Sequence, residues 1–255
     1  MKQMFQADSP DNLDLQSFAA NYVQPFMDEQ DKTAEDYDRC MNKKSLIARW
    51  MRYWLSPGRV VFVNTPARKL PSKLSLSSSD KILDIGCGYG SLLIYLHEKI
   101  AFSGRIEGID VSPVMVELAK EELQKKGLGN KIAVKIGRGT DLPYPDETFD
   151  IVLSTYVVKH LCDDSLLLML KEVLRVLKKG GYFCLWEAAP SRIKTLDKIN
   201  RKLLSSEVSI LHLRSSEDLR KVMKKAGFSS LERFGHAPYL YYPVMPRAGF
   251  IAAKP

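Results

Sequence analysis

Apolar and polar positions alternate between two spacings from residue 80 onward. Short apolar runs typical of buried strands are separated by longer segments with apolar residues three and four positions apart, which are typical of amphipathic helices. The strand-like runs are KILDIG (81–86), RIEGID (105–110), KIAVKIG (131–137), FDIVLSTYV (149–157), YFCLWEA (182–188), FSSLERFG (228–235) and RAGFIAAKP (247–255). Buried strands alternating with helices predict an α/β fold, a doubly wound, mostly parallel seven-stranded sheet with helices on both faces.

The segments between these strands carry helix start and stop signals. The helix predicted after RIEGID has Ser112 as its N-cap, Pro113 at its first position and Gly127 after its end. A later helix is expected to be capped by Ser215 or Ser216. The amphipathic segment LLLMLKEVLRVLKKGG (166–181) is expected to be a helix closed by its glycines.

Residues 1–79 do not follow this rhythm. Apolar residues fall at helical steps from Tyr37 to Leu55, which predicts a helix over 35–57 that ends at Pro57 and Gly58. We therefore expect two units, a helical cap or substrate lid at 1–79 and a sheet domain at 80–255.

Composition is that of an ordinary globular chain, with 255 residues, 45% apolar and 27% charged. No run of about 18 apolar residues occurs, so no membrane span is expected. The four cysteines include no C-x-x-C pair and fit no metal pattern, and the first residues lack the features of a secretory signal. These observations favour a reduced, cytoplasmic protein without a metal site.

The net charge of +8 is unevenly distributed. Residues 1–38 contain nine acids and two lysines, a charge of −7, which leaves +15 on the remainder. A basic body attracts RNA, an anionic substrate or a membrane surface. No basic run is interleaved with aromatic residues, so a solvated lysine-rich surface is the favoured interpretation.

Three glycines occupy every second position of ILDIGCGYGS, between a predicted strand and a helix. Gly86, Gly88 and Gly90 allow a ligand to approach the backbone closely at the helix N-terminus. Ser91 stands where the third glycine of a dinucleotide fingerprint belongs, and no P-loop pattern occurs. Asp110 ends the next strand, where an acid accepts hydrogen bonds from ribose hydroxyls in nucleotide-binding folds. Together these features predict a nucleoside ligand that is not a dinucleotide.

Four motifs in order resemble a known family. ILDIGCGYG with GIDVSP, DLPYPDETFDIVLSTYVVKHL, EVLRVLKKGGYFCLWE and EDLRKVMKKAGFSSLERF are similar to the motifs of S-adenosylmethionine-dependent methyltransferases with a Rossmann-like fold (class I). The likeness is greatest to the small-molecule branch that includes quinone-biosynthesis enzymes, and it covers about residues 80 to 255. It implies that the chain is an enzyme with S-adenosyl-L-methionine as its cofactor.

The resemblance implies a set of cofactor-binding residues. They are Tyr37, Asp84, Gly86, Gly88, Gly90, Asp110, Val111, Gly139, Thr140, Asp141 and Ser154. By this likeness Asp84 holds the methionine amino group through water, Asp110 holds the ribose hydroxyls and Tyr37 touches the methionine end. The structural alternatives are a tight turn for the glycines and a helix-entry role for Asp110.

The stretch GRGTDLP departs from the family pattern. Arg138 stands where the family often has the acid that binds the adenine amino group. Asp141 is the nearest acid, and it is equally a candidate for a surface turn. The backbone amides of Gly139 and Thr140 remain available to the adenine ring.

Methyl transfer from a sulfonium is an in-line displacement, for which the protein mainly aligns the reactants and excludes water. His160 is the candidate general base, with a packed or capping histidine as the alternative. Tyr156 is a candidate for orienting the substrate, or else a packed aromatic residue. Trp50 and Trp54 line an acceptor pocket in one interpretation and form a packed helix stripe in the other.

The resulting hypothesis is methyl transfer to a small molecule that is aromatic, quinone-like or another secondary metabolite. A tRNA-modifying methyltransferase and a non-catalytic subunit that binds S-adenosylmethionine are the alternatives. Nucleic acid is disfavoured as a partner because the first 38 residues are acidic and no dedicated RNA-binding segment occurs. The residues do not indicate the acceptor atom or the oligomeric state.

Overall fold

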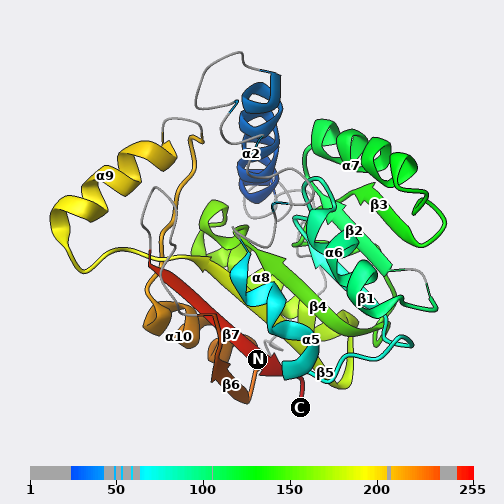
Figure 1. Cartoon of the computed structure of the whole chain (residues 1–255). Coiled ribbons are helices and arrows are strands. Elements are labelled where there is room, and N and C mark those ends of the chain that lie inside the picture. The colour runs from blue at the N-terminus through cyan, green and yellow to red at the C-terminus, as the bar shows by residue number, and fades with distance from the viewer. Residues whose placement is uncertain are drawn as a thin grey trace, which may run out of the picture.

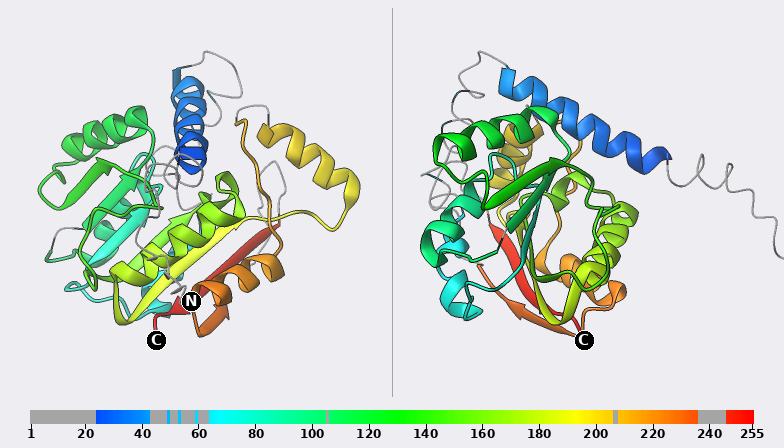
Figure 2. Two further views of the ribbon diagram at one scale, coloured as in Figure 1. Left: turned by 180° about the vertical axis from the view of Figure 1, so that it is seen from behind. Right: turned by 90° about the vertical axis from the view of Figure 1, so that its right-hand side faces the viewer.

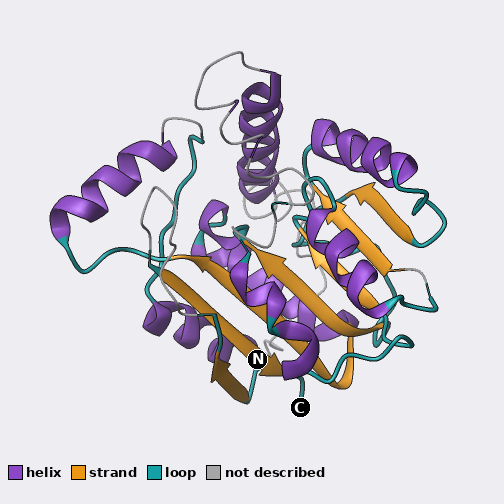
Figure 3. Cartoon of the chain, in the orientation of Figure 1, coloured by secondary structure: helices purple, strands orange, loops and turns teal. Residues whose placement is uncertain are grey.

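The computed structural model describes residues 24–42, 64–104, 106–205, 208–235 and 246–255, and the single positions 49, 53 and 59. Strands in this part of the chain form one central sheet with helices around it (Figures 1 and 3). The strands are β1 (Ile82–Ile85), β2 (Ile106–Asp110), β3 (Ile132–Ile136), β4 (Phe149–Thr155), β5 (Leu177–Ala188), β6 (Ser230–Arg233) and β7 (Arg247–Ala253). The helices are α2 (Gln24–Asn42), η2 (Thr65–Arg68), α5 (Leu70–Lys73), α6 (Ser91–Ile100), α7 (Pro113–Lys125), η3 (Val158–His160), α8 (Asp163–Val176), α9 (Lys194–Ser205) and α10 (Ser216–Ala226).

The strand order is β3-β2-β1-β4-β5-β7-β6, which confirms the predicted seven-stranded, mostly parallel sheet. β7 pairs antiparallel with both of its neighbours, and the other pairs are parallel. The chain winds outward in one direction from β1 to β3 and in the other from β4. The loops that follow β1 and β4 therefore flank the switch point of the sheet, where ligands bind in folds of this kind.

Alternate residues of each central strand supply two hydrophobic cores, one on each face of the sheet. Leu83 and Ile85 of β1 face a core that includes residues of α8 and α10, whereas Ile82 faces a core that includes residues of α6 and α5. Figure 2 shows these helices on the two sides of the sheet. Burial on both faces explains why the strands are continuous apolar runs in the sequence.

The predicted helix caps are present. Ser112 precedes α7, and its hydroxyl oxygen accepts a hydrogen bond from the Met115 N–H at 3.0 Å. Ser215 rather than Ser216 caps α10, in a reciprocal capping box with Asp218. Each cap satisfies a backbone donor that the helix itself leaves unpaired.

The prediction of a helix closed by the glycines of 166–181 is wrong. α8 ends at Val176, and β5 begins at Leu177, before both glycines. Gly180 has φ +72°, and a Cβ on Gly181 would lie 2.8 Å from the Asp150 carbonyl oxygen. The register of β4 and β5 shifts near this point, so the glycines serve a β-bulge and its close backbone approach instead of a helix end.

The amino-terminal helix also differs from its predicted bounds. α2 begins at Gln24, well before the predicted start at 35, and ends at Asn42. Most of the predicted range beyond residue 42 lies outside the described residues, including Trp50 and Trp54.

Gly249 generates a test of the packing between the last strands. It lies in β7, and a Cβ there would enter the Phe234 carbonyl oxygen and lie 3.0 Å from the Leu185 carbonyl oxygen. We expect Gly249→Ala to lower the free energy of unfolding by about 1–3 kcal/mol, because backbone atoms must shift to admit the methyl group. Urea denaturation measures the change. Gly104→Ala, whose Cβ would meet nothing within 4 Å, is the control, and equal midpoints for the two variants would contradict the expectation.

Candidate functional site

The loop between β1 and α6 is built from backbone. Gly86, Gly88 and Gly90 have φ of +73°, +51° and +71°, a region that favours glycine. The Gly86 and Cys87 N–H groups donate to the Ile109 carbonyl oxygen at 2.8 and 3.0 Å, which ties the loop to the end of β2. A Cβ on Gly86 would collide with Val157, whereas one on Gly88 would meet nothing within 4 Å. The glycines therefore give a tight turn with open space beside Gly88.

Asp110 is hydrogen-bonded to the loop between β1 and α6. Its carboxylate accepts hydrogen bonds from the Gly88 N–H at 2.8 Å and the Ser112 N–H at 3.0 Å. Burial raises the pKa of Asp110, and the two N–H donors oppose that shift. The predicted ribose acid thus lies directly at the glycine loop, with Val111 half-buried between it and α7.

Asp84 is a buried carboxylate in β1, with 1% of its surface exposed. Its Oδ1 atom has no hydrogen-bond partner within the described part of the chain. Burial raises the pKa of Asp84 well above its ordinary value, and the nearby Asp110 raises it further. A buried acceptor without a partner requires an external donor such as a water molecule or a ligand ammonium group.

The loop after β3 carries the residues predicted to contact adenine. Gly139 is buried, Thr140 is half-buried and the Asp141 side chain is exposed. The Thr140 hydroxyl accepts a hydrogen bond from the Gln30 amide at 2.8 Å, and Arg138 forms an ion pair with Asp31. Helix α2 thus engages the side chains of this loop, including the arginine that departs from the family pattern. The exposure of Asp141 leaves its contact with adenine a prediction.

The end of β4 holds Ser154, which was predicted to bind the cofactor, and the segment after β4 holds Tyr156 and His160, which were predicted for the acceptor side. Ser154 is fully buried, and its hydroxyl has no partner among the described residues. Tyr156 has φ +60°, an uncommon conformation for a residue with a side chain. The Tyr156 N–H donates to the Trp186 carbonyl oxygen at 3.0 Å, and the Lys159 ammonium binds the Tyr156 carbonyl oxygen.

A buried ion pair supports this strained turn. Glu187, 1% exposed, accepts hydrogen bonds from the Lys159 N–H at 3.1 Å and the Ala188 N–H at 2.7 Å. The Lys159 ammonium lies 3.5 Å from the same carboxylate. Burial lowers the pKa of Lys159 and raises that of Glu187, and their mutual attraction opposes both shifts. Glu187 therefore anchors the turn that carries His160.

His160 is buried between Tyr37 and the segment before α10. Its Nδ1 lies 3.0 Å from the Ile210 carbonyl oxygen, and its Nε2 lies 3.0 Å from the Tyr37 hydroxyl. Because a carbonyl oxygen only accepts, Nδ1 carries the proton, and Nε2 accepts from Tyr37. Burial and Lys159 lower the pKa of His160 well below its ordinary value, so the ring is neutral at pH 7. Burial, Glu187 and Asp110 raise the pKa of Tyr37, which keeps its hydroxyl protonated.

Helix α2 lies across the end of the sheet where the parallel strands end (Figures 1 and 2). Besides the contacts of Gln30, Asp31 and Tyr37, its Asp38 accepts a hydrogen bond from the Ser112 hydroxyl beside Asp110. Asp36 accepts one from the Ser209 N–H at 2.6 Å. One helix thus contacts the ends of β2, β3 and β4.

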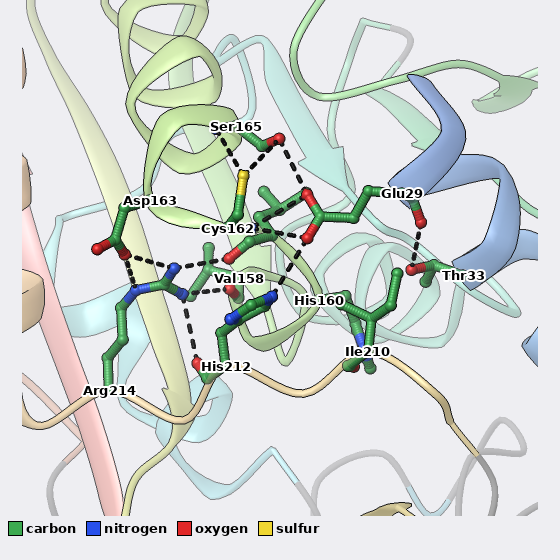
Figure 4. A network of polar contacts seen from close by, with 11 residues as sticks. Glu29, Thr33, Val158, His160, Cys162, Asp163, Ser165, Ile210, His212 and Arg214 are labelled. Atoms are coloured by element: carbon green, nitrogen blue, oxygen red, sulfur yellow. Dashed lines mark hydrogen bonds and ion pairs between the residues drawn. The ribbon is translucent and has the colours of Figure 1, made fainter. Parts of the chain in front are cut away.

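The carboxylate of Glu29 on α2 contacts several polar groups at once (Figure 4). It accepts from the Cys162 N–H at 3.0 Å and from the Ser165 hydroxyl at 3.0 Å, at the N-terminus of α8. His212 Nε2 lies 3.2 Å from the same group. Arg214 holds the segment that carries His212 through hydrogen bonds to the Val158, Leu161 and Asp163 oxygens. The network joins α2 to the body of the protein beside His160.

The structure brings together much of the predicted set. The glycine loop, Asp84 and Asp110 lie at the switch point, and Tyr37 lies against His160 rather than alone at the cofactor end. Sequence reasoning missed the following anchoring residues: Glu29, Gln30, Asp31, Asp36, Asp38, Lys159 and Arg214. The acidic excess of residues 1–38 was the available signal for the helix α2 contacts, since an amphipathic acidic helix needs polar partners.

No group of three or more His, Cys, Asp or Glu side chains in the described part of the chain is arranged to hold a metal ion. None of the described helices is both long enough and apolar enough to cross a bilayer.

Comparison with known proteins gives consistent results. A family model described as a methyltransferase domain matches residues 76–227. Demethylmenaquinone methyltransferase of Symbiobacterium thermophilum is 30% identical over 159 residues, 62% of this chain and 57% of its own. Ajmaline N-methyltransferase of Rauvolfia serpentina is 32% identical over 148 residues, 58% of this chain and 44% of its own. The chain spans about half the length of the curated relatives it matches.

A solved structure described as a SAM dependent methyltransferase from Aquifex aeolicus has the same fold. It superposes with a TM-score of 0.57 at 23% identity, and the match covers 74% of this chain and 89% of that one.

The Glu29 network generates a test of how α2 is held. We expect Glu29→Ala to speed hydrogen exchange of the α2 amides, because three donors lose a charged acceptor. The opening free energy should fall by about 1.5–3 kcal/mol. Hydrogen exchange read by mass spectrometry measures it. Glu35→Ala, an exposed acid on the same helix, is the control. If both variants exchange alike, Glu29 does not anchor α2.

Proposed function

Because the chain belongs to the methyltransferase domain family, we propose that it is an enzyme that transfers a methyl group from S-adenosylmethionine to a small-molecule acceptor. The observation that carries the proposal is the glycine loop, which offers backbone and open space at the switch point above the paired carboxylates Asp84 and Asp110. A ligand with both an ammonium group and a ribose fits this pair, since both carboxylates can accept hydrogen bonds and neither forms an ion pair within the described part of the chain.

Five of the cofactor residues have a proposed task. Asp84 receives the methionine ammonium, directly or through water, at its unpartnered Oδ1 atom. Asp110 accepts from the ribose hydroxyls while it keeps the Gly88 N–H in place. Gly139 and Thr140 border the adenine ring, and Ser154 offers a buried hydroxyl at the end of β4. The bound cofactor supplies an activated methyl group on a sulfonium, so the residues around it need only orient the acceptor and exclude water.

The acceptor side of the proposed site is the pair of Tyr37 and His160. The neutral ring of His160 can take a proton at Nε2, the atom to which Tyr37 now donates. When an acceptor hydroxyl meets Tyr37, the proton of Tyr37 passes to His160 in the same step as Tyr37 takes the acceptor proton, so Tyr37 stays protonated throughout. Tyr156, whose side chain packs in part against the core on the α6 face of the sheet, is proposed to orient the acceptor ring from its strained turn.

An aromatic or quinone-like acceptor is the proposed substrate class. Similarity to a demethylmenaquinone methyltransferase and to an ajmaline N-methyltransferase supports a small organic acceptor. These comparisons do not favour a tRNA-modifying enzyme or a non-catalytic subunit. A cytoplasmic location stays a prediction.

We also propose the division into 1–79 and 80–255, with α2 as the part of 1–79 that caps the site and 80–255 as the cofactor-binding domain. The contacts of α2 with the loops that follow β2, β3 and β4 support this division. In this arrangement α2 excludes water from the reacting groups and must move for ligands to enter.

The cofactor assignment is tested by calorimetric titration with S-adenosylhomocysteine. Asp110→Ala should weaken binding by roughly 10- to 100-fold, because charged hydrogen bonds to the ribose are lost. Glu121→Ala, an exposed acid on α7, is the control, and circular dichroism checks that each variant is folded. Unchanged affinity in a folded Asp110→Ala protein would remove Asp110 from the cofactor site.

The role of His160 is tested by turnover with phenols and hydroquinones as acceptors. We expect His160→Gln to lower kcat by about 100-fold, since the proton acceptor is lost. Because burial lowers the pKa of His160, it stays neutral above its ordinary pKa and for some distance below it. Wild-type kcat should therefore not decline through an ordinary histidine titration between pH 7 and 6. Release of S-adenosylhomocysteine measures the rate, and His97→Gln, on α6, is the control. A near-normal rate for His160→Gln would reduce this histidine to a packing role.

A further inference from the structure

Helix α9 has a surface that the proposed reaction does not use. It lies between β5 and α10 in the chain and stands outside the two helix layers of the sheet, beside the end where α2 lies (Figure 1). Ile193, directly before the helix, is 62% exposed, and Ile199 within it is 48% exposed. Exposed apolar side chains beside a row of cations on one helix are typical of helices that lie at a membrane surface.

A row of lysines lies beside these isoleucines. Lys194, Lys198 and Lys202 are exposed and recur every four residues, so they follow one side of the helix. Ile199 is three residues before Lys202 and therefore borders the row. The segment 192–202 contains five cations and one acid, Asp197, which pairs with Arg201 at 2.7 Å. The exposed side of α9 is therefore strongly cationic with an apolar border.

The opposite side of α9 faces the protein. Asn200 is buried, with 1% of its surface exposed, and Leu196 and Leu203 are half-buried. At 100° per residue, Asn200 lies about 160° from both Lys198 and Lys202 around the helix axis. The helix is thus held by one side and presents the lysine row and Ile199 to the surroundings.

We propose that α9 docks on the surface of a lipid bilayer that contains anionic lipids. Lysines near such a surface are attracted by the lipid headgroups, and neighbouring isoleucines gain by entering the boundary with the acyl chains. RNA matches the charge but not the isoleucines, and residues 189–205 contain no aromatic side chain for base stacking. Charge complementarity together with the apolar border therefore favours the membrane surface.

The chain that follows α9 connects this surface to the candidate site. The Ser209 N–H binds Asp36 of α2, the Ile210 carbonyl oxygen binds His160, and the His212 N–H donates to the Lys159 carbonyl oxygen at 2.6 Å. Docking through α9 would bring the acceptor side close to the bilayer. If the proposed function holds, the acceptor class is a lipophilic molecule dissolved in the membrane.

Sedimentation with vesicles tests the docking itself. The full chain should bind vesicles of phosphatidylglycerol and phosphatidylcholine, bind pure phosphatidylcholine more weakly, and lose affinity as salt rises. The variant K194Q/K198Q/K202Q should lower the partition coefficient by about 10-fold or more. The control K221Q/K224Q/K225Q removes the same charge from exposed positions of α10 and should bind like the wild type. The variant I193S/I199S should also bind vesicles more weakly, because the isoleucines are proposed to enter the bilayer. Binding through charge alone would leave this variant unaffected.

Several outcomes would overturn the proposal. They are absence of vesicle binding by the wild type, equal losses in the two lysine variants, unchanged binding by I193S/I199S, and an α9 lysine variant that loses affinity for RNA but not for vesicles. Titration with S-adenosylhomocysteine separates this proposal from the proposed function. A protein that binds this probe but no vesicles overturns the docking alone, and one that binds vesicles but not the probe overturns the methyltransferase assignment alone.

Discussion

The hydrogen bonds that tie the loop after β1 to the end of β2 are the constraint on which the site depends. Three consecutive N–H groups, those of Gly86, Cys87 and Gly88, all point inward to the Ile109 carbonyl oxygen and the Asp110 carboxylate. Only a backbone with positive φ can turn so sharply, and a side chain on Gly86 would strike Val157. The same bonds place the buried carboxylate of Asp84 and the half-buried carboxylate of Asp110 beside open space, and the proposed cofactor site follows from them.

The fold was predictable because its signals are local. Continuous apolar strands, the Ser112 and Ser215 caps and the glycine loop each depend on neighbouring residues, and the structure contains all of them. Gly180 and Gly181 led to the wrong prediction of a helix end, because a helix end and a β-bulge need the same backbone freedom. The choice between them depends on pairing with Asp150 and its neighbours, which no local pattern records.

The contacts of α2 were beyond sequence reasoning for a related reason. Glu29 and Cys162, or Tyr37 and His160, are separated by more than a hundred residues, and no periodicity relates them. The acidic excess of residues 1–38 was visible, yet the sequence did not indicate which basic or polar groups it would meet. In the structure, four acids of α2 bind loops and helix ends around one side of the sheet. The acidic residues therefore attach α2 to the rest of the protein instead of only facing solvent.

The hydroxyl of Tyr37 occupies the free nitrogen of His160 only while α2 is in place. In the proposed reaction, the Tyr37 hydroxyl that donates to His160 therefore moves together with α2, the helix that must open for ligands to enter. Every opening of the site would therefore break this hydrogen bond together with the other polar attachments of α2, and every closing would restore them. Withdrawal of α2 would also interrupt the proposed relay, because the acceptor proton reaches His160 only through Tyr37.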